Sequence, residues 1–136
     1  HAFKYLPKQC LLQVYLYERK SIMEESIKYY INIRLLRKGD DLKTSFGPGT
    51  ACLLKGIQQS GSINKATKAM GMAYSKAWRV LDVAEKQLGF ALIERKVPDG
   101  SSLTEQGRQF LALYDEMQQA ANQAVREVLK SSGFKF

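Results

Sequence analysis

Histidine and cysteine are scarce in this 136-residue chain, which has one histidine and two cysteines. The histidine is the first residue, His1, and Cys10 and Cys52 stand far apart, without the short spacing of metal ligands. No convergent acid, base or nucleophile set and no phosphate-binding glycine loop is recognisable. We therefore expect no enzyme, no metal site and no cofactor, and we expect both thiols to be free in a reducing compartment.

Long hydrophobic runs are also missing. A membrane-spanning helix needs roughly 18–20 consecutive apolar residues, and no run approaches this length. No export signal is visible either. These absences favour a cytoplasmic protein without a membrane partner. Residues 1–26 are interpreted as an N-terminal extension without an assigned function, in which Met23 is a candidate for the natural start.

Acidic residues are the minority among the charged ones. Lysine and arginine number 21 against 13 aspartates and glutamates, which gives a formal net charge of +8. A basic domain of this size has an electrostatic reason to bind a polyanion. Many basic proteins never bind nucleic acid, so the charge counts only if it lies on a recognisable reading element.

Periodicity and capping residues predict the elements. Residues 27–45 alternate with strand period and are broken by Gly39-Asp40-Asp41, which predicts a β-hairpin with a return strand at 42–46. Ser62 and Thr104 are good N-caps, Gly71 is a helix stop, and Pro98-Asp99-Gly100 is a turn. The further predicted elements are helices at 49–60, 63–70 and 73–88, strands at 91–95 and 101–103, and a helix from 105 to about 130.

Two short helices joined by a tight glycine-containing turn form a helix-turn-helix, and a following hairpin forms a wing. The predicted fold is therefore mainly α: a winged helix-turn-helix with an N-terminal β-hairpin and a long C-terminal dimerisation helix. The expected division is an N-terminal extension at 1–26, a DNA-binding domain at 27–104, and a dimerisation helix with tail at 105–136.

The helix at 73–88 is the predicted reading element, because a major groove admits an α-helix and its first turns reach base edges. Arg79 is the best candidate for a bidentate contact to guanine. Lys76 is a candidate phosphate contact, and Arg95 and Lys96 lie near the wing tip. The full set of candidate DNA-binding residues is Ser62, Asn64, Lys65, Ala73, Tyr74, Ser75, Lys76, Arg79, Arg95 and Lys96. For each of them, ordinary solvated surface is an equally good interpretation, and Trp78 is interpreted as a packing residue.

These residues also carry a family resemblance. The stretches Phe46-Gly47-Pro48-Gly49, Gly61-Ser62-Ile63 and 71–78 resemble the N-terminal DNA-binding domain of ModE-type molybdate-responsive regulators. The stretches 85–89, 92–95 and 103–107 are similar to the broader LysR-type winged helix. The resemblance covers roughly residues 27–130. It implies operator binding and transcriptional control, but not molybdate sensing, since the sequence contains no oxyanion-binding domain after this region.

The last predicted helix carries an apolar stripe close to a heptad pattern. The stripe, which we call the seam, consists of Phe110, Leu113, Met117, Ala120, Ala124 and Val128. It predicts a homodimer that places two reading helices about 34 Å apart on a palindromic site. The alternative is that the helix simply packs back on the predicted sheet at 27–45.

Two other functions compete with DNA reading. A winged helix can serve as a protein–protein interaction module, because the fold alone does not fix function. That module would bind its partner with little dependence on salt, whereas DNA binding weakens steeply as salt rises. RNA binding ranks lower, because the sequence lacks the paired aromatic strand motif that stacks bases.

Overall fold

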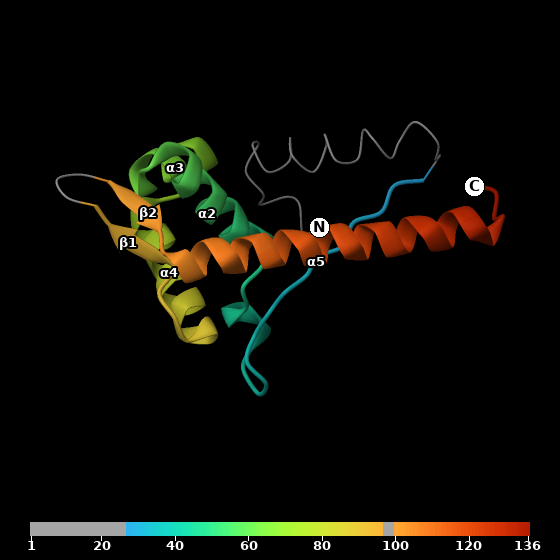
Figure 1. Cartoon of the computed structure of the whole chain (residues 1–136), viewed down its shortest axis with the longest axis horizontal. Coiled ribbons are helices and arrows are strands. Elements are labelled where there is room, and N and C mark those ends of the chain that lie inside the picture. Colours follow the sequence, from blue (N-terminus) through green and yellow to red (C-terminus); the bar gives the residue numbers. More distant parts are fainter. Residues whose placement is uncertain (1–26, 97–99) are drawn as a thin grey trace.

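The computed structural model describes residues 27–96 and 100–136 (Figure 1). A compact head of short elements sits at one end of a long helix, which extends well beyond it. The elements of the described part are η1 (Leu42–Thr44), α2 (Pro48–Ser60), α3 (Ile63–Met70), α4 (Tyr74–Leu88), β1 (Ile93–Arg95), β2 (Ser101–Leu103) and α5 (Glu105–Ser132).

The helix boundaries follow from capping chemistry. Pro48 occupies the first turn of α2, where its missing N–H needs no partner. The Ser62 side chain accepts the backbone N–H of Lys65 at the start of α3, and that of Thr104 accepts the N–H of Gly107 at the start of α5. The predicted helices and the strand at 101–103 are confirmed to within about two residues at each end, and the first wing strand is shorter than predicted, beginning at Ile93.

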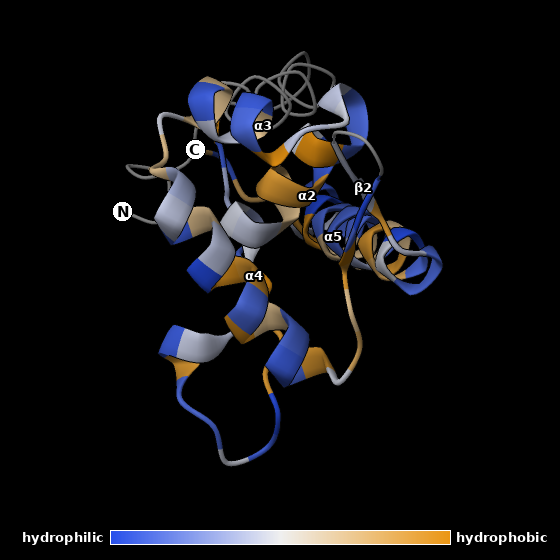
Figure 2. Ribbon diagram, turned by 90° about the vertical axis from the view of Figure 1, so that its left-hand side faces the viewer, coloured by the Kyte–Doolittle hydropathy of each residue, from blue (hydrophilic) through white to orange (hydrophobic). Residues whose placement is uncertain are grey.

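The core forms around α2, which lies between α3, α4 and α5 in Figure 2. Leu53, Leu54 and Ile57 of α2 are fully buried. Buried residues of the other helices meet them: Ile63, Ala66, Ala77, Leu81, Ala84, Leu111 and Tyr114. An ion pair of 2.7 Å between Lys55 Nζ and Asp115 Oδ1 adds a polar link from α2 to α5. The head is thus one core that includes the first half of α5.

The segment from residue 27 to 35 alternates between partly covered and exposed residues, as its sequence predicts. The element that packs against this segment is α5 rather than a second strand. The Tyr114 hydroxyl donates to the Ile33 carbonyl at 2.8 Å, and the Gln118 amide donates to the Ile31 carbonyl at 3.0 Å. Further along, the Tyr29 hydroxyl donates to the Asn122 carbonyl at 2.8 Å. The segment therefore runs antiparallel along α5.

The predicted N-terminal hairpin is reduced to one antiparallel bridge between Leu35 and Phe46. The predicted return strand is wrong for residues 42–44, which form the 3-10 helix η1. Asp41 explains the difference, because its side chain accepts the Lys43 N–H at 3.0 Å and caps η1. The carbonyls of Ile31 and Ile33 bond to side chains of α5, so the strand ladder has no continuation there.

Cys52 corrects another expectation. It is buried at 7% exposure and is disulfide-bonded, so the prediction of a free thiol at this position is wrong. Cys10 lies outside the described residues. Among the described residues, no helix is long and apolar enough to cross a bilayer, and no group of three or more metal-ligating side chains gathers.

Candidate nucleic-acid interface

The turn between α3 and α4 sets the angle of the reading helix. Gly71 has a φ of 65°, in the left-handed region that glycine adopts without strain. The N–H of Gly71 donates to Lys68 and the N–H of Met72 donates to Thr67, which closes the end of α3. Thr67 is buried and its hydroxyl donates to the Asn64 carbonyl. These bonds hold the turn rigid and aim the first turn of α4 outward.

The first turn of α4 is open and carries no negative charge. Ala73, its N-cap, makes no side-chain capping bond, and the first turn contains no acidic residue. Tyr74, Ser75, Lys76 and Arg79 are all exposed, while Ala77 and Leu81 face the core. Unpaired N–H groups and the helix dipole at this end favour an anion. The face is thus bare, polar and cationic where a groove would receive it.

The aromatic residues of α4 join this helix to the wing. The Tyr74 and Trp78 rings meet edge to face at 6.2 Å. The Arg95 guanidinium of β1 lies over the Trp78 ring, 5.2 Å from its centroid. A cation over the face of tryptophan is attracted by the ring quadrupole. Trp78 is therefore a packing residue, as expected from the sequence, and its partner is the wing.

The wing is fixed to the helix-turn-helix by its second strand. β1 and β2 pair antiparallel, with Ile93 opposite Leu103 and Arg95 opposite Ser101. The Ser101 N–H donates at 2.9 Å to the carbonyl of Gly61, in the turn between α2 and α3. Gly100, at a φ of 112°, passes so close that a Cβ there would lie 2.9 Å from the Gly61 carbonyl oxygen. The predicted tip residues 97–99 lie outside the described residues.

The acidic residues of α4 are engaged by neighbours. Asp82 Oδ2 lies 2.9 Å from Lys86 Nζ, in an exposed pair one helical turn apart. Glu85 accepts the Leu92 N–H at 2.6 Å and so fixes the chain that follows α4. The second half of the helix therefore carries two carboxylates against one lysine, and the positive charge of Lys76 and Arg79 lies on its first half.

The predicted DNA-binding residues fall on three adjacent elements. Asn64 and Lys65 are exposed on the first turn of α3. Ser62 is half-buried. Its hydroxyl oxygen accepts the Lys65 N–H at 3.2 Å and its backbone N–H donates to Ser60 Oγ at 3.3 Å, so the hydroxyl hydrogen is what it has left to donate to a ligand. Arg95 and Lys96 are exposed on the wing side. Their roles in binding stay predictions.

One residue and one contact of this surface were not predicted. Gln87, near the end of α4, donates its amide to Thr44 Oγ1 at 2.7 Å and to Asp40 Oδ2 at 3.0 Å. It also accepts the Arg37 N–H at 2.8 Å. A glutamine among helical residues carries no signal of such a role in a single sequence. The link between Arg95 and Trp78 was equally invisible, since it depends on the strand register.

The predicted dimerisation seam divides in two. Phe110 and Met117 pack against the core, and the Phe110 ring meets Phe46 edge to face at 4.8 Å. The other members are exposed, with Leu113 at 50% and Val128 at 66%. Ala120 and Ala124 are exposed beside them. An apolar strip thus faces outward along the part of α5 that leaves the head.

The fold and this surface define a winged helix-turn-helix protein. Residues 53–108 match the family described as bacterial regulatory helix-turn-helix protein, lysR family. The matched span begins inside α2 and ends in the first turn of α5, so it holds the complete helix-turn-helix and the wing. Over these residues the chain is similar to the lysR-family helix-turn-helix.

Known regulators give a finer comparison. The transcriptional regulator ModE of Haemophilus influenzae is 37% identical over 81 residues, which is 57% of this chain and 32% of that protein. The molybdenum transport protein ModE of Azotobacter vinelandii is 31% identical over 78 residues, or 54% of this chain and 29% of that protein. The chain thus spans about a third of the length of these relatives, and the predicted resemblance to ModE-type regulators is confirmed for this part.

A solved structure supports the fold. The crystal structure of a CbnR_DBD–DNA complex superposes with a TM-score of 0.50 and 20% sequence identity. The match covers 61% of this chain and 94% of that one. At this identity the likeness concerns the fold, which is a winged helix-turn-helix as the sequence predicts.

Proposed function

We propose that this protein is a cytoplasmic transcription regulator that binds duplex DNA sequence-specifically by inserting the first half of α4 into a major groove. The observation that carries the proposal is the open N-terminal end of α4, with Ser75, Lys76 and Arg79 exposed and no acidic side chain in its first turn. The comparisons support it, because residues 53–108 match a family of bacterial regulatory helix-turn-helix proteins and one relative is named a transcriptional regulator. No catalytic family is indicated by these comparisons.

The exposed side chains divide into two roles. The Arg79 fork matches the paired acceptors of guanine in the major groove and would specify a base. Lys76 and Lys65 would contact phosphates, which position the protein without reading sequence. The Arg95–Trp78 contact holds the wing at a fixed distance from α4, so that Lys96 can reach the backbone beside the groove.

Selection of bound duplexes from a random pool at physiological salt tests this function. A defined consensus is expected, with affinity that falls steeply as salt rises.

Two variants test the division of roles. Arg79→Ala should relax the base preference at one position of each half-site. Lys76→Ala should weaken binding to all sequences and reduce the salt slope by about one. Equal losses on every duplex for both variants would refute the division of roles, and salt-independent binding to a protein partner would favour an interaction module.

We infer that the protein acts as a homodimer on a palindromic operator. The support is the outward strip of Leu113, Ala120, Ala124 and Val128 on α5, since small residues in a helix seam allow a partner helix to approach closely. The segment at 27–35 bonds to Tyr114, Gln118 and Asn122 of α5 rather than to the strip, so the strip remains for a second copy. A two-fold axis through α5 would space the reading helices by about one duplex turn.

Analytical ultracentrifugation of a matched pair tests the dimer. Ala124→Glu places a charge inside the seam, whereas Ala112→Glu places the same charge on an exposed site outside it. We expect the first variant to sediment as a monomer and the second as the wild-type dimer. A monomeric wild type, or dissociation of both variants, would contradict the proposed interface.

A further inference from the structure

The loop at 37–45 lies against the flank of α4 opposite to the wing. On that helix Trp78 contacts the wing residue Arg95, and Gln87 contacts the loop. Gln87 follows Trp78 by nine residues, which is about two and a half turns at 3.6 residues per turn. The two side chains therefore leave α4 in opposite directions, and the exposed Arg79 lies between them. The reading helix has a supporting element on each side.

Gln87 holds the loop at three points. It bonds to the backbone N–H of Arg37, to the Asp40 carboxylate and to the Thr44 hydroxyl, at 2.8, 3.0 and 2.7 Å. Arg37 reaches the end of the same helix, because a Cβ at Gly89 would lie 2.7 Å from Arg37 Nη2. A cation is favoured beside the C-terminal end of a helix. The loop is thus fixed to α4.

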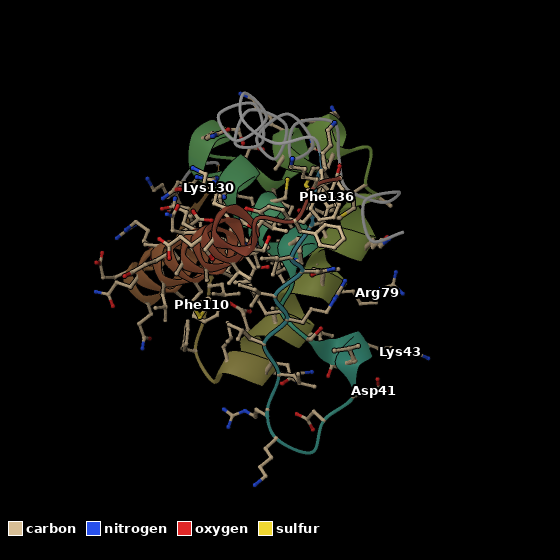
Figure 3. All side chains as sticks on the ribbon, turned by 90° about the vertical axis from the view of Figure 1, so that its right-hand side faces the viewer. Asp41, Lys43, Arg79, Phe110, Lys130 and Phe136 are labelled. Carbon is tan, nitrogen blue, oxygen red and sulfur yellow. The ribbon has the colours of Figure 1, made fainter. Side chains whose placement is uncertain are left out.

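In this loop the acidic side chains accept hydrogen bonds from neighbours, whereas the lysines form no ion pairs with described residues. Asp40 accepts from Gln87, and Asp41 accepts the Lys43 N–H as the cap of η1. Lys38 and Lys43 are exposed, and neither forms an ion pair with any other described residue. Figure 3 shows Lys43 and Arg79 projecting from the same side of the molecule. Lys43 therefore remains available on the side from which Arg79 projects, while the two carboxylates of the loop accept internal hydrogen bonds.

We propose that the loop at 37–45 is a second DNA-contacting arm, in which Lys43 binds a backbone phosphate beside the groove on the flank opposite to the wing. The inference rests on the proposed function of α4 and adds to it a contact outside the helix-turn-helix and wing. With an element on each flank, the protein would clamp the backbone on both sides of the reading helix. The arm reads no base, because its lysine acts as a point charge.

Two substitutions with opposite expected effects on DNA affinity test the arm. Lys43→Ala removes the phosphate contact, so it should weaken binding severalfold on every sequence and lower the salt slope by about one. Asp41→Asn keeps a side chain that can cap η1 but removes a negative charge near the phosphates, so it should tighten binding. Lys28→Ala, an exposed lysine on the segment beside α5, is the matched control and should bind as the wild type. A merely structural role of η1 would not give opposite signs.

A second experiment, with modified DNA, identifies the phosphate that Lys43 contacts. Duplexes that carry single neutral methylphosphonates are compared for wild type and Lys43→Ala in the same assay. One position flanking the half-site should weaken the wild type and leave the variant unaffected, because the variant has already lost that contact. Gln87→Leu, which releases the loop, should lose the sensitivity at the same position although Lys43 is intact.

The outcomes separate the arm from the function of α4. If the wild type binds no duplex, both proposals fail. If the wild type binds and depends on Arg79, but Lys43→Ala and Asp41→Asn match it in affinity and salt slope, the arm alone is overturned. A methylphosphonate effect that persists in Lys43→Ala would assign that phosphate to another side chain and would also overturn the arm.

Discussion

The two halves of α5 differ in what covers them, although they are parts of one unbroken helix. In the first half Leu111 and Tyr114 are 4% and 3% exposed and belong to the core of the head. In the second half Val128 is 66% exposed, and the helix leaves the head (Figure 1). The apolar stripe continues through both halves. An apolar stripe thus indicates which side of a helix is suited to burial, but it does not indicate which element packs against that side.

The largest expected effect is in the first half. Leu111→Ala removes a buried side chain from the core and leaves a cavity, so we expect a loss of about 2–5 kcal/mol in the free energy of unfolding. Leu113→Ala is the matched control, with the same change two residues away at a side chain that is 50% exposed. Its loss should stay within about 0.5 kcal/mol in the monomer. Urea unfolding at low protein concentration measures the free energy of unfolding of both variants. Equal losses would contradict the distinction between the buried side of α5 at Leu111 and its exposed side at Leu113.

A smaller effect is expected at Tyr114, where the helix meets the segment at 27–35. Tyr114→Phe deletes the hydrogen bond to the Ile33 carbonyl, which should cost about 0.5–1.5 kcal/mol at neutral pH. The same tyrosine predicts a pH dependence. Burial raises the pKa of Tyr114 to about 12, above the ordinary value of about 10 that it has in an unfolded chain.

The sign of that dependence follows from proton binding. Above about pH 10 the unfolded chain releases the Tyr114 proton while the folded protein retains it. The stability from this group is therefore complete below about pH 10 and is lost as the pH rises toward 12. Unfolding of wild type and Tyr114→Phe across this window should show the two curves converging. Parallel curves would mean that the hydroxyl is not held away from water.

The same region shows how far sequence reasoning reached. Caps at Ser62 and Thr104 located the helices, because a side chain that bonds to the next turn is a local signal. The alternation at 27–35 was also real, since it reports that one side of an extended chain is covered. It could not report that the cover is α5, because this depends on packing between residues about ninety positions apart.

The candidate site also has one part that the sequence could predict and one part that it could not. The open face of α4 could be predicted from the buried stripe of Ala77, Leu81 and Ala84, which leaves the other side of the helix free. The contact of Trp78 with Arg95 and the bonds of Gln87 could not be predicted, since each joins α4 to an element whose position is set by the whole fold. Local rules therefore give the reading helix, whereas its supports on both flanks require the structure.

The smallest expected effect on a single protomer is at the far end of α5. Val128→Lys changes an exposed position and replaces a β-branched residue by a better helix former, so the unfolding free energy of the monomer should change by less than about 0.5 kcal/mol. In a dimer joined through the seam the same lysine meets an apolar partner and weakens association. Melting at protein concentrations a hundredfold apart separates the two cases, because only a dimer gains stability with concentration. We expect a concentration-dependent Tm in the wild type and a constant Tm in Val128→Lys. If both proteins melt at a constant temperature, the distal half of α5 is free of a second copy, and its apolar strip must be assigned to another partner.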